Sequence, residues 1–546
     1  MKNLFVAVAA SLCAVSASAT RVSPERAVAY AGAYLRNVVR TGLKPVSAAP
    51  VVFDGAAALY VVSLEPDGWV LVAADDVIAP IVGYSESGSL AADSLDPNLR
   101  SYLSLFASDI SFRSACGDSS SPAWATDTVP STNKVESAVA PLISVEWNQS
   151  GKYRQYCPTG LAGDAIVGCV AVGMGQAMSH YRWPAKPVGF KSYNSANYGV
   201  LSVDYDNEPA YNWSEVMSGQ SKDNDGKECA RLLYHCGVSV EMDYGPGESG
   251  VTYMGVVPYA LKTYFGYSNK VRIVSKRDAS LAEWADLLKN ELSAGRPLIY
   301  AGYSATGGHC FNVDGYNGQG LFHFNFGWGG NGNGYFNISS HAYADGERCA
   351  VNFAPATGKP TAVILSKDAV AKGVPAGTVV ATLAADTDMD GCEFSFEVSG
   401  VENPVTHVVA DPVFDVDGDK LVTNSLFAEK YGESSKAKVV SVNIKVTNVA
   451  TLDSYTQKVS LSLTSSSAIA DVREALSSVS CSDGSIAVSA AGSAVAVAVV
   501  AVDGKIVGSA SLAPFASAAF DGLAGGVYVV RISDGVSSQS AKVLVK

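Results

Sequence analysis

The segment VGCVAVGMGQAM, residues 167–178, places a single thiol at the start of an apolar run. Val170, Met174 and Met178 follow Cys169 at helical spacing, so we expect the thiol at the N-terminus of a helix. The free backbone N–H groups and the helix dipole at that end favour a thiolate, which would make the sulfur a nucleophile. A buried structural cysteine or one half of a disulfide fits the same position, and this segment alone leaves all three interpretations open.

A thiol nucleophile needs a general base, and the chain contains six histidines. His309 is the strongest candidate, because in ATGGHCFNVDGY it follows two glycines that leave room for a substrate chain. His323, later in the same region, is the second candidate. His180 lies about three turns along the helix of Cys169 and cannot reach back to the thiol. Two others are expected to be structural: His235 in a helix and His407 in the β-rich C-terminal region.

Two side chains could complete the chemistry. Asn325, in FHFNFGWGGNGNGYF, could accept a hydrogen bond from one imidazole nitrogen of His309 and fix its tautomer. Gln149, in WNQ, could donate a side-chain N–H to an oxyanion beside the backbone N–H of Cys169. The catalytic groups would then follow one another along the chain in the order Gln, Cys, His, Asn.

The elements that must position these residues follow a small N-terminal unit. Ser23-Pro24 predicts an N-capped helix, Pro66-Asp67-Gly68 a turn between two strands, and Asp96-Pro97 the start of a second helix. A polar, proline-containing linker comes next, then a region with five of the seven tryptophans, and finally strand-rich sequence. We divide the chain into a signal peptide (1–19), an N-terminal unit (20–116), a linker (117–134), a catalytic domain (135–358) and two β-sandwich modules (360–465 and 468–546).

Composition limits the classes of function. A net charge of −13 without a long basic cluster argues against a nucleic-acid surface. The N-terminus has the pattern of a secretory signal peptide: a basic Lys2, an apolar stretch and the cleavage motif Ala17-Ser18-Ala19. No later segment is expected to span a bilayer. We therefore expect a secreted or cell-surface protein. Beyond Cys13 the chain has nine cysteines, an odd number that leaves at least one thiol free, and it has no C-x-x-C spacing for structural zinc.

Five blocks together resemble the streptopain family of papain-fold cysteine peptidases: PLISVEWNQSGKYRQYCP, GCVAVGMGQAMSHYRWP, VEMDYGPGESG, GGHCFNVDGY and FHFNFGWGGNGNGYF. The resemblance covers about residues 141–340 and implies an α+β, papain-like catalytic domain that needs no cofactor. It assigns the nucleophile to Cys169, the base to His309, the orienting role to Asn325 and the oxyanion donor to Gln149. It also implies four residues that bind substrate or wall its cleft: Met242, Tyr244, Gly245 and Trp328.

The sequence departs from the family pattern at two positions. Phe326 stands where the family usually has the first tryptophan of NWGWGG, so an aromatic shield is kept but an indole N–H is lost. Cys310 replaces a small residue beside His309. Neither change removes a proton-transfer group, so we expect an active enzyme.

The flanking modules carry further resemblances. The N-terminal unit is similar to inhibitory propeptides, the 360–465 module to cadherin-like sandwiches, and the last module to C-terminal sorting domains of type IX secretion. In DTDMDGCEFSFE, Asp386, Asp388, Asp390 and Glu397 match a calcium-loop pattern, but strands are expected on both sides in place of EF-hand helices.

The sequence therefore predicts a secreted cysteine endopeptidase, a hydrolase made as a zymogen, with a thioester intermediate. Its partners would be protein or peptide substrates, its own prodomain as inhibitor, and the type IX secretion machinery. A non-catalytic surface adhesin that binds glycan or host protein is the leading alternative. Amide transfer or deamidation is another, because a fold does not fix the reaction.

Overall fold

The computed structural model describes residues 19–124, 137–304, 307–338, 343, 345–402, 404–465, 477–482, 485–491, 494–501, 505–514, 516–534 and 538–545. Most of the predicted signal peptide and of the linker therefore lies outside the described residues. The chain divides into two compact units. Unit 1 comprises residues 1–361 with the loops 386–393 and 448–453, and unit 2 comprises the rest.

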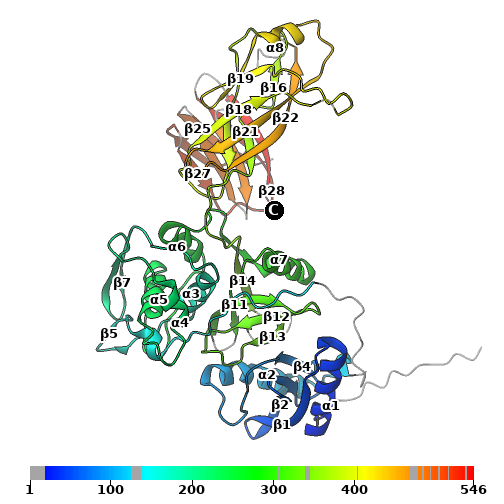
Figure 1. Cartoon of the computed structure of the whole chain (residues 1–546), viewed down its shortest axis with the longest axis vertical. Coiled ribbons are helices and arrows are strands. Elements are labelled where there is room, and N and C mark those ends of the chain that lie inside the picture. The colour runs from blue at the N-terminus through cyan, green and yellow to red at the C-terminus, as the bar shows by residue number, and fades with distance from the viewer. Residues whose placement is uncertain are drawn as a thin grey trace, which may run out of the picture. The chain divides into compact units, whose positions relative to one another are not determined.

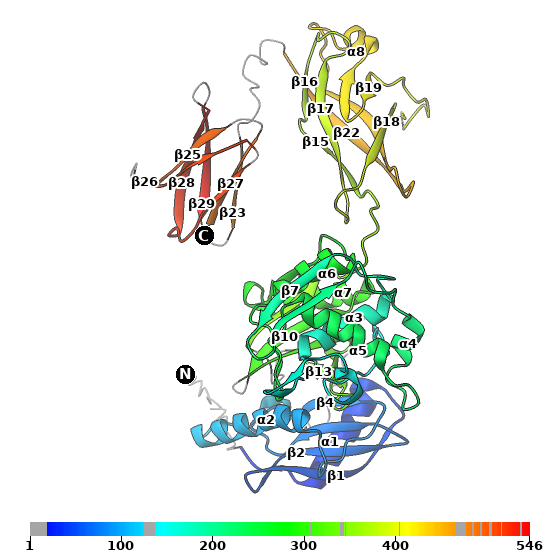
Figure 2. The same ribbon diagram turned by 90° about the vertical axis from the view of Figure 1, so that its left-hand side faces the viewer.

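The N-terminal part of unit 1 is a four-stranded meander with two helices against it (Figure 2). The Ser23 hydroxyl accepts from the Arg26 N–H and caps the first helix, and the Asp96 carboxylate accepts from the Asn98 N–H and caps the second, so both predicted helix starts are confirmed. The elements are α1 (Pro24–Tyr34), a π-helical turn (Leu35–Val39), β1 (Lys44–Phe53), β2 (Ala56–Glu65), β3 (Trp69–Ala73), β4 (Ile81–Ser85) and α2 (Pro97–Cys116).

The rest of unit 1 combines helices with a sheet. Its helices are α3 (Cys169–Tyr181), α4 (Trp213–Ser218), α5 (Lys227–Ser239), α6 (Val256–Phe265) and α7 (Leu281–Ser293). The strands are β5 (Thr159–Gly160), β6 (Gly163–Asp164), β7 (Phe190–Ser195), β8 (Gly199–Asp204), β9 (Arg272–Ser275), β10 (Leu298–Ser304), β11 (Gly307–Tyr316), β12 (Leu321–Asn325), β13 (Gly334–Asn337) and β14 (Asp345–Val351). The predicted α+β class is confirmed.

One ten-stranded sheet joins the two parts of unit 1, in the order β1-β2-β3-β4-β13-β12-β11-β10-β14-β9. The junction is the antiparallel pair β4 and β13, where Tyr84 faces Tyr335 and Gly83 faces Phe336 (Figure 1). A Cβ at position 83 would lie 2.5 Å from the Phe336 ring, so only glycine fits at this crossing. The N-terminal unit is thus an extension of the catalytic sheet.

Unit 1 has two apolar cores. The first runs through the N-terminal unit and the ten-stranded sheet and includes Tyr102, Phe326 and Phe336. The second surrounds α3, α5 and α6, and Cys169 packs at its edge. Helix α3 also contacts β11, the strand that carries His309. The two predicted catalytic residues therefore lie where the two cores meet.

Unit 2 contains two pairs of facing sheets, each pair with its own apolar core. The first pair has the strand orders β15-β17-β20-β19 and β16-β22-β21-β18, and the second has β23-β24-β27 and β26-β25-β28-β29. The predicted β-sandwich class of this region is confirmed. The first pair comprises β15 (Ala362–Leu365), β16 (Ala369–Ala371), β17 (Val379–Asp386), β18 (Phe394–Ser399), β19 (Phe414–Asp417), β20 (Lys420–Thr423), β21 (Val439–Asn448) and β22 (Ser454–Thr464), with α8 (Ser425–Lys430). The second comprises β23 (Ser477–Ser482), β24 (Ser485–Ala490), β25 (Val495–Ala501), β26 (Ile506–Leu512), β27 (Ser517–Phe520), β28 (Gly526–Ser533) and β29 (Ser538–Val545).

Candidate active site

Cys169 is the first residue of α3, as the spacing predicts. Gly168 precedes it with φ = 89°, and a Cβ there would come within 2.7 Å of the Met242 sulfur. The turn into the helix therefore requires glycine at this position. All nine cysteines of the described residues are free thiols, which removes the disulfide interpretation of Cys169.

The surroundings of the Cys169 sulfur act on its pKa in opposite directions. Burial raises the pKa of the thiol, and the nearby Glu248 carboxylate adds to this, whereas backbone N–H groups of Cys310, Val170 and Cys169 itself favour the thiolate and lower it. Burial is the largest of these effects, so the pKa stays above its ordinary value. Burial therefore disfavours the thiolate form of Cys169, although the backbone N–H of Cys310, the residue after His309, favours that form.

His309 lies near the start of β11 and is buried. Its Nε2 atom lies 2.9 Å from the backbone oxygen of Phe326. A carbonyl oxygen only accepts, so Nε2 carries the proton and Nδ1 keeps the lone pair that a general base needs. Burial lowers the pKa of His309 to about 4, and the hydrogen bond to Phe326 opposes this only in part. Rings of Trp328 and Tyr343 lie 4.8 and 5.3 Å from the imidazole centroid.

A cavity of about 210 Å³ lies beside His309. It brings together Gln149, His309 and Trp328, three of the predicted site residues. Asn98 and Ser101, from α2 of the N-terminal unit, line the same cavity. The remaining lining residues are Ile166, Gly247, Glu248, Ser249, Gly307, Gly308 and Tyr343. The N-terminal unit therefore covers the cleft that contains the candidate base and oxyanion donor.

Asn325 does not contact His309 through a hydrogen bond, contrary to the expectation from the sequence. Its side-chain amide donates to the Val145 carbonyl at 2.8 Å, and its side-chain oxygen accepts from Gln176 at 3.1 Å and from the Gly327 N–H at 3.3 Å. The backbone of Phe326, one residue later, holds the imidazole instead. Asn325 therefore positions the chain that carries this carbonyl.

Gln176 is a buried hub that the sequence pattern did not lead us to expect. Its amide nitrogen donates to the side-chain oxygens of Asn312 and Asn325, each at 3.1 Å, and its oxygen accepts from the Trp147 N–H at 2.9 Å. Gln176 and Asn312 are fully buried. The hub connects α3, β11, β12 and the segment that leads to Gln149. A glutamine in the middle of an otherwise apolar helix is the signal that could have revealed it.

The predicted residues Met242, Tyr244 and Gly245 are buried and do not line the cavity. Met242 packs against the turn at Gly168, and Tyr244 belongs to the same core. The cavity is lined instead by residues 247–249 of the same loop. The prediction that Met242, Tyr244 and Gly245 wall the cleft is therefore wrong for this cavity.

Two other histidines, His323 and His235, have structural surroundings. His323 Nδ1 lies 2.6 Å from the buried carboxylate of Asp314, outside the cavity. His235 is buried against Tyr211, with its Nδ1 2.7 Å from the hydroxyl oxygen, and burial lowers its pKa to about 3. His309 is thus the histidine, among the described residues, that lines this cavity.

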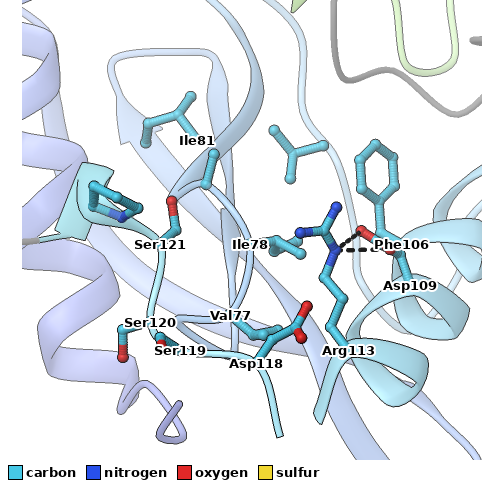
Figure 3. A pocket seen from close by; sticks show the side chains of 13 residues that line it. Val77, Ile78, Ile81, Phe106, Asp109, Arg113, Asp118, Ser119, Ser120 and Ser121 are labelled. Carbon is cyan, nitrogen blue, oxygen red and sulfur yellow. Dashed lines mark hydrogen bonds and ion pairs between the residues drawn. The ribbon is translucent and has the colours of Figure 1, made fainter. Parts of the chain in front are cut away.

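A larger cavity, of about 530 Å³, lies elsewhere, within the N-terminal unit (Figure 3). The Asp109–Arg113 ion pair on α2 and residues 118–122 border it. Its lining contains neither cysteine nor histidine, so it offers no pairing of a thiol with an imidazole.

The three aspartates of the candidate calcium loop have protein partners. Asp386 pairs with Lys270 at 2.7 Å, Asp388 accepts from the Gly358 N–H at 2.8 Å, and Asp390 accepts from Asn269 at 2.6 Å. The described residues include no group of three or more His, Cys, Asp or Glu side chains that could hold a metal ion. These contacts explain the acidic loop without a metal, and calcium binding stays a prediction from the sequence.

Comparison with known proteins agrees with this geometry. Residues 147–336 match the Peptidase C10 family, and residues 19–110 match the Spi protease inhibitor family. Streptopain of Streptococcus pyogenes is 29% identical over 310 residues, which cover 52% of this chain and 74% of streptopain. The thiol protease/hemagglutinin PrtT of Porphyromonas gingivalis is 29% identical over 289 residues, 50% of this chain but only 33% of PrtT.

Among solved structures, a prointerpain A fragment of Prevotella intermedia is 25% identical, with a TM-score of 0.46 over 56% of this chain and 98% of that one. In this chain the segment that matches the inhibitor family, residues 19–110, precedes the segment that matches the peptidase family, residues 147–336. This is the order that the sequence predicts. Residues 147–336 of this chain therefore match the cysteine peptidases of the streptopain family, Peptidase C10, and the segment before them matches a family of protease inhibitors.

Proposed function

We propose that this chain is an exported cysteine endopeptidase made as a zymogen. The observation that carries the proposal is the shared cavity in which Gln149, His309 and the prodomain residues Asn98 and Ser101 meet, three residues along the chain from Cys169 at Ile166. A prodomain helix that lines the cleft would exclude a peptide substrate until the prodomain is removed.

In the proposed reaction, His309 Nδ1 accepts the proton of Cys169 and the thiolate attacks the carbonyl carbon of a peptide bond. The oxyanion accepts hydrogen bonds from the Cys169 backbone N–H and the Gln149 side chain. The imidazolium then donates its proton to the leaving amine, and a thioester remains. Water, deprotonated by His309, attacks the thioester and frees the acid and the thiol. The Phe326 carbonyl holds Nε2 throughout, so the imidazole keeps its orientation.

The burial of both groups supports the zymogen part of the proposal. Burial raises the pKa of Cys169 and lowers that of His309, so both charged forms of the catalytic pair are disfavoured while the prodomain is in place. Departure of α2 would admit water to the cavity, and this hydration would reduce the free-energy cost of charging Cys169 and His309. Covering the cleft and keeping the pair neutral would act together to suppress activity.

Export follows from the signal peptide expected at residues 1–19, and no helix of the described residues is long and apolar enough to cross a membrane. The last sandwich module would direct the chain to the type IX secretion machinery, as its terminal GLAGGVYVVRI and AKVLVK indicate. A purely adhesive role is not favoured, because the similar proteins are peptidases.

The test is digestion of a denatured protein library, with the cut sites sequenced, by the wild-type chain and by Cys169→Ala. Wild type should cut many unstructured peptides and the variant none. Selective labelling of Cys169 by an epoxide-type thiol reagent should accompany activity. A wild-type chain that folds, loses its prodomain and still cuts no peptide would overturn the proposal.

A further inference from the structure

Helix α2 of the prodomain inserts one aromatic side chain into the peptidase. Tyr102 is fully buried, and its ring centroid lies 5.1 Å from Phe326, 5.5 Å from Tyr343 and 5.9 Å from Phe336. We call these three side chains the aromatic pocket. Ring pairs at such separations contribute specific attraction beyond the burial of apolar area. The prodomain thus fills a site whose shape suits an aromatic ring.

The aromatic pocket adjoins the catalytic histidine. Phe326 and Tyr343, two of its walls, lie 6.4 and 5.3 Å from the His309 ring centroid. Ser101, the residue before Tyr102, lines the catalytic cavity. One turn of α2 therefore reaches both the cleft and the pocket, so a chain lying in the cleft could reach both as well.

The walls belong to the peptidase and are held by contacts of its own. Phe326 stacks on Trp328 at 4.7 Å, and Phe336 stacks on Phe324 at 5.3 Å. Tyr343 is seated by Gly302, where a Cβ would come within 2.0 Å of the Tyr343 carbonyl oxygen. These contacts do not involve the prodomain. Phe336 also faces Gly83 and the Trp69 ring of the prodomain, so release of the prodomain frees one side of Phe336, while the contacts within the peptidase keep the three walls around the vacated site of Tyr102.

The position of His309 sets which part of a substrate faces this pocket. The imidazolium must donate its proton to the leaving amine, so the His309 side of the cleft holds the residues that follow the scissile bond. We propose that, in the processed enzyme, the aromatic pocket binds an aromatic side chain of the substrate on this leaving-group side. The inference rests on the proposed function and adds the class of substrate that the enzyme prefers.

The experiment uses the processed enzyme and pairs of internally quenched peptides. Within a pair the peptides differ only in Phe or Ala at the first, second or third residue after the scissile bond. We expect kcat/KM to favour Phe by about tenfold at one of these positions, as an apolar pocket of this kind allows. Phe336→Leu should reduce that ratio to about twofold. Phe353→Leu, an equally buried phenylalanine that stacks on Tyr267 in the other core, is the matched control and should keep the ratio.

The measured quantity is a ratio of two kcat/KM values from one enzyme preparation, so a general loss of activity leaves that ratio unchanged. If Phe336→Leu does not fold, Tyr343→Leu changes a second wall and should lower the same ratio. An active enzyme with no preference for Phe at any of the three positions overturns this inference and leaves the proposed function standing. An enzyme that cuts neither peptide of any pair overturns both.

Discussion

The His309 imidazole is held by the backbone of Phe326, whose carbonyl oxygen lies 2.9 Å from Nε2. No side-chain substitution can remove this acceptor directly. Changes in the orientation of the base must therefore act through the residues that place the Phe326 carbonyl, and Asn325 is the nearest of them.

Asn325→Ala should therefore impair catalysis less than loss of the base. We expect kcat to fall about tenfold to hundredfold, whereas His309→Ala removes proton transfer and should cost at least about a thousandfold. Steady-state hydrolysis of an unstructured peptide by the processed variants provides the measurement. Equal losses in the two variants would mean that Asn325 takes part in the reaction more directly than its contacts indicate.

Gln176→Leu should destabilise the fold strongly. It leaves the Trp147 backbone N–H and the Asn312 side-chain oxygen without partners in a dry interior, and it removes one of the two donors to the Asn325 side-chain oxygen. We expect the free energy of unfolding to fall by about 3 kcal/mol. Urea unfolding of the Cys169→Ala chain measures this without self-digestion. Gln155→Leu serves as the control, because Gln155 is exposed and water can replace its bonds. A change in the free energy of unfolding below about 0.5 kcal/mol for Gln176→Leu would contradict the structural role given to Gln176.

Acid should weaken the folded zymogen through His309. Its pKa of about 4 lies below the 6.5 of an exposed histidine, so between these values the unfolded chain binds a proton that the folded chain does not. Stability therefore falls as pH drops through this window, by up to about 3 kcal/mol, and is unaffected above it. Thermal unfolding of Cys169→Ala at pH 7 and pH 4.5 tests this against the same chain with His309→Gln. His235, whose pKa is also lowered, is present in both chains, so the difference isolates His309. Identical acid sensitivity of the two chains would argue against the effect.

The thiol of Cys169 should react slowly in the zymogen. Because burial raises the pKa of this thiol, its thiolate form is disfavoured at pH 7. We expect iodoacetamide to alkylate it at least tenfold more slowly than in the processed enzyme, with a rate that still rises above pH 9. Peptide mapping separates it from Cys481, an exposed internal control. Equal rates in both forms would show that the prodomain does not set the state of the thiol.

Processing should cut between residues 125 and 138. Before this stretch, Trp124 is buried and donates from its indole to the Ile78 carbonyl, and Tyr30 donates to the Ala123 carbonyl. After it, Val139 exchanges two backbone hydrogen bonds with Tyr316. A protease must draw the chain into its cleft, and these contacts oppose that movement. Both flanks are therefore protected from cleavage. N-terminal sequencing should find the new end in this window, and Cys169→Ala should accumulate uncut. A cut between Gly117 and Trp124 in the folded zymogen would contradict this.

Local features of the site could be predicted from the sequence, and features set by strand register could not. The helix start at Cys169 depends on neighbouring residues, and spacing alone located it. The acceptor for His309 depends on the pairing of β11 with β12, which sets Asn312 opposite Asn325 and leaves both beside Gln176. Every residue has a backbone carbonyl, so the residue type at position 326 gives no indication that its carbonyl accepts from His309. In the loop 242–249, the residue types suggested a cleft wall, but only the fold shows which of them face it.

The continuity of one sheet across β4 and β13 has a consequence for the order of biosynthesis. The prodomain meander is made first, and its four strands pair with one another in chain order, so it can form before the rest of the chain is complete. The free edge of the meander at β4 is then available when β13, roughly 250 residues later, has been made. The prodomain can thus act as a template for the sheet of the peptidase, and the proteolysis that releases it removes the scaffold on which that sheet was assembled.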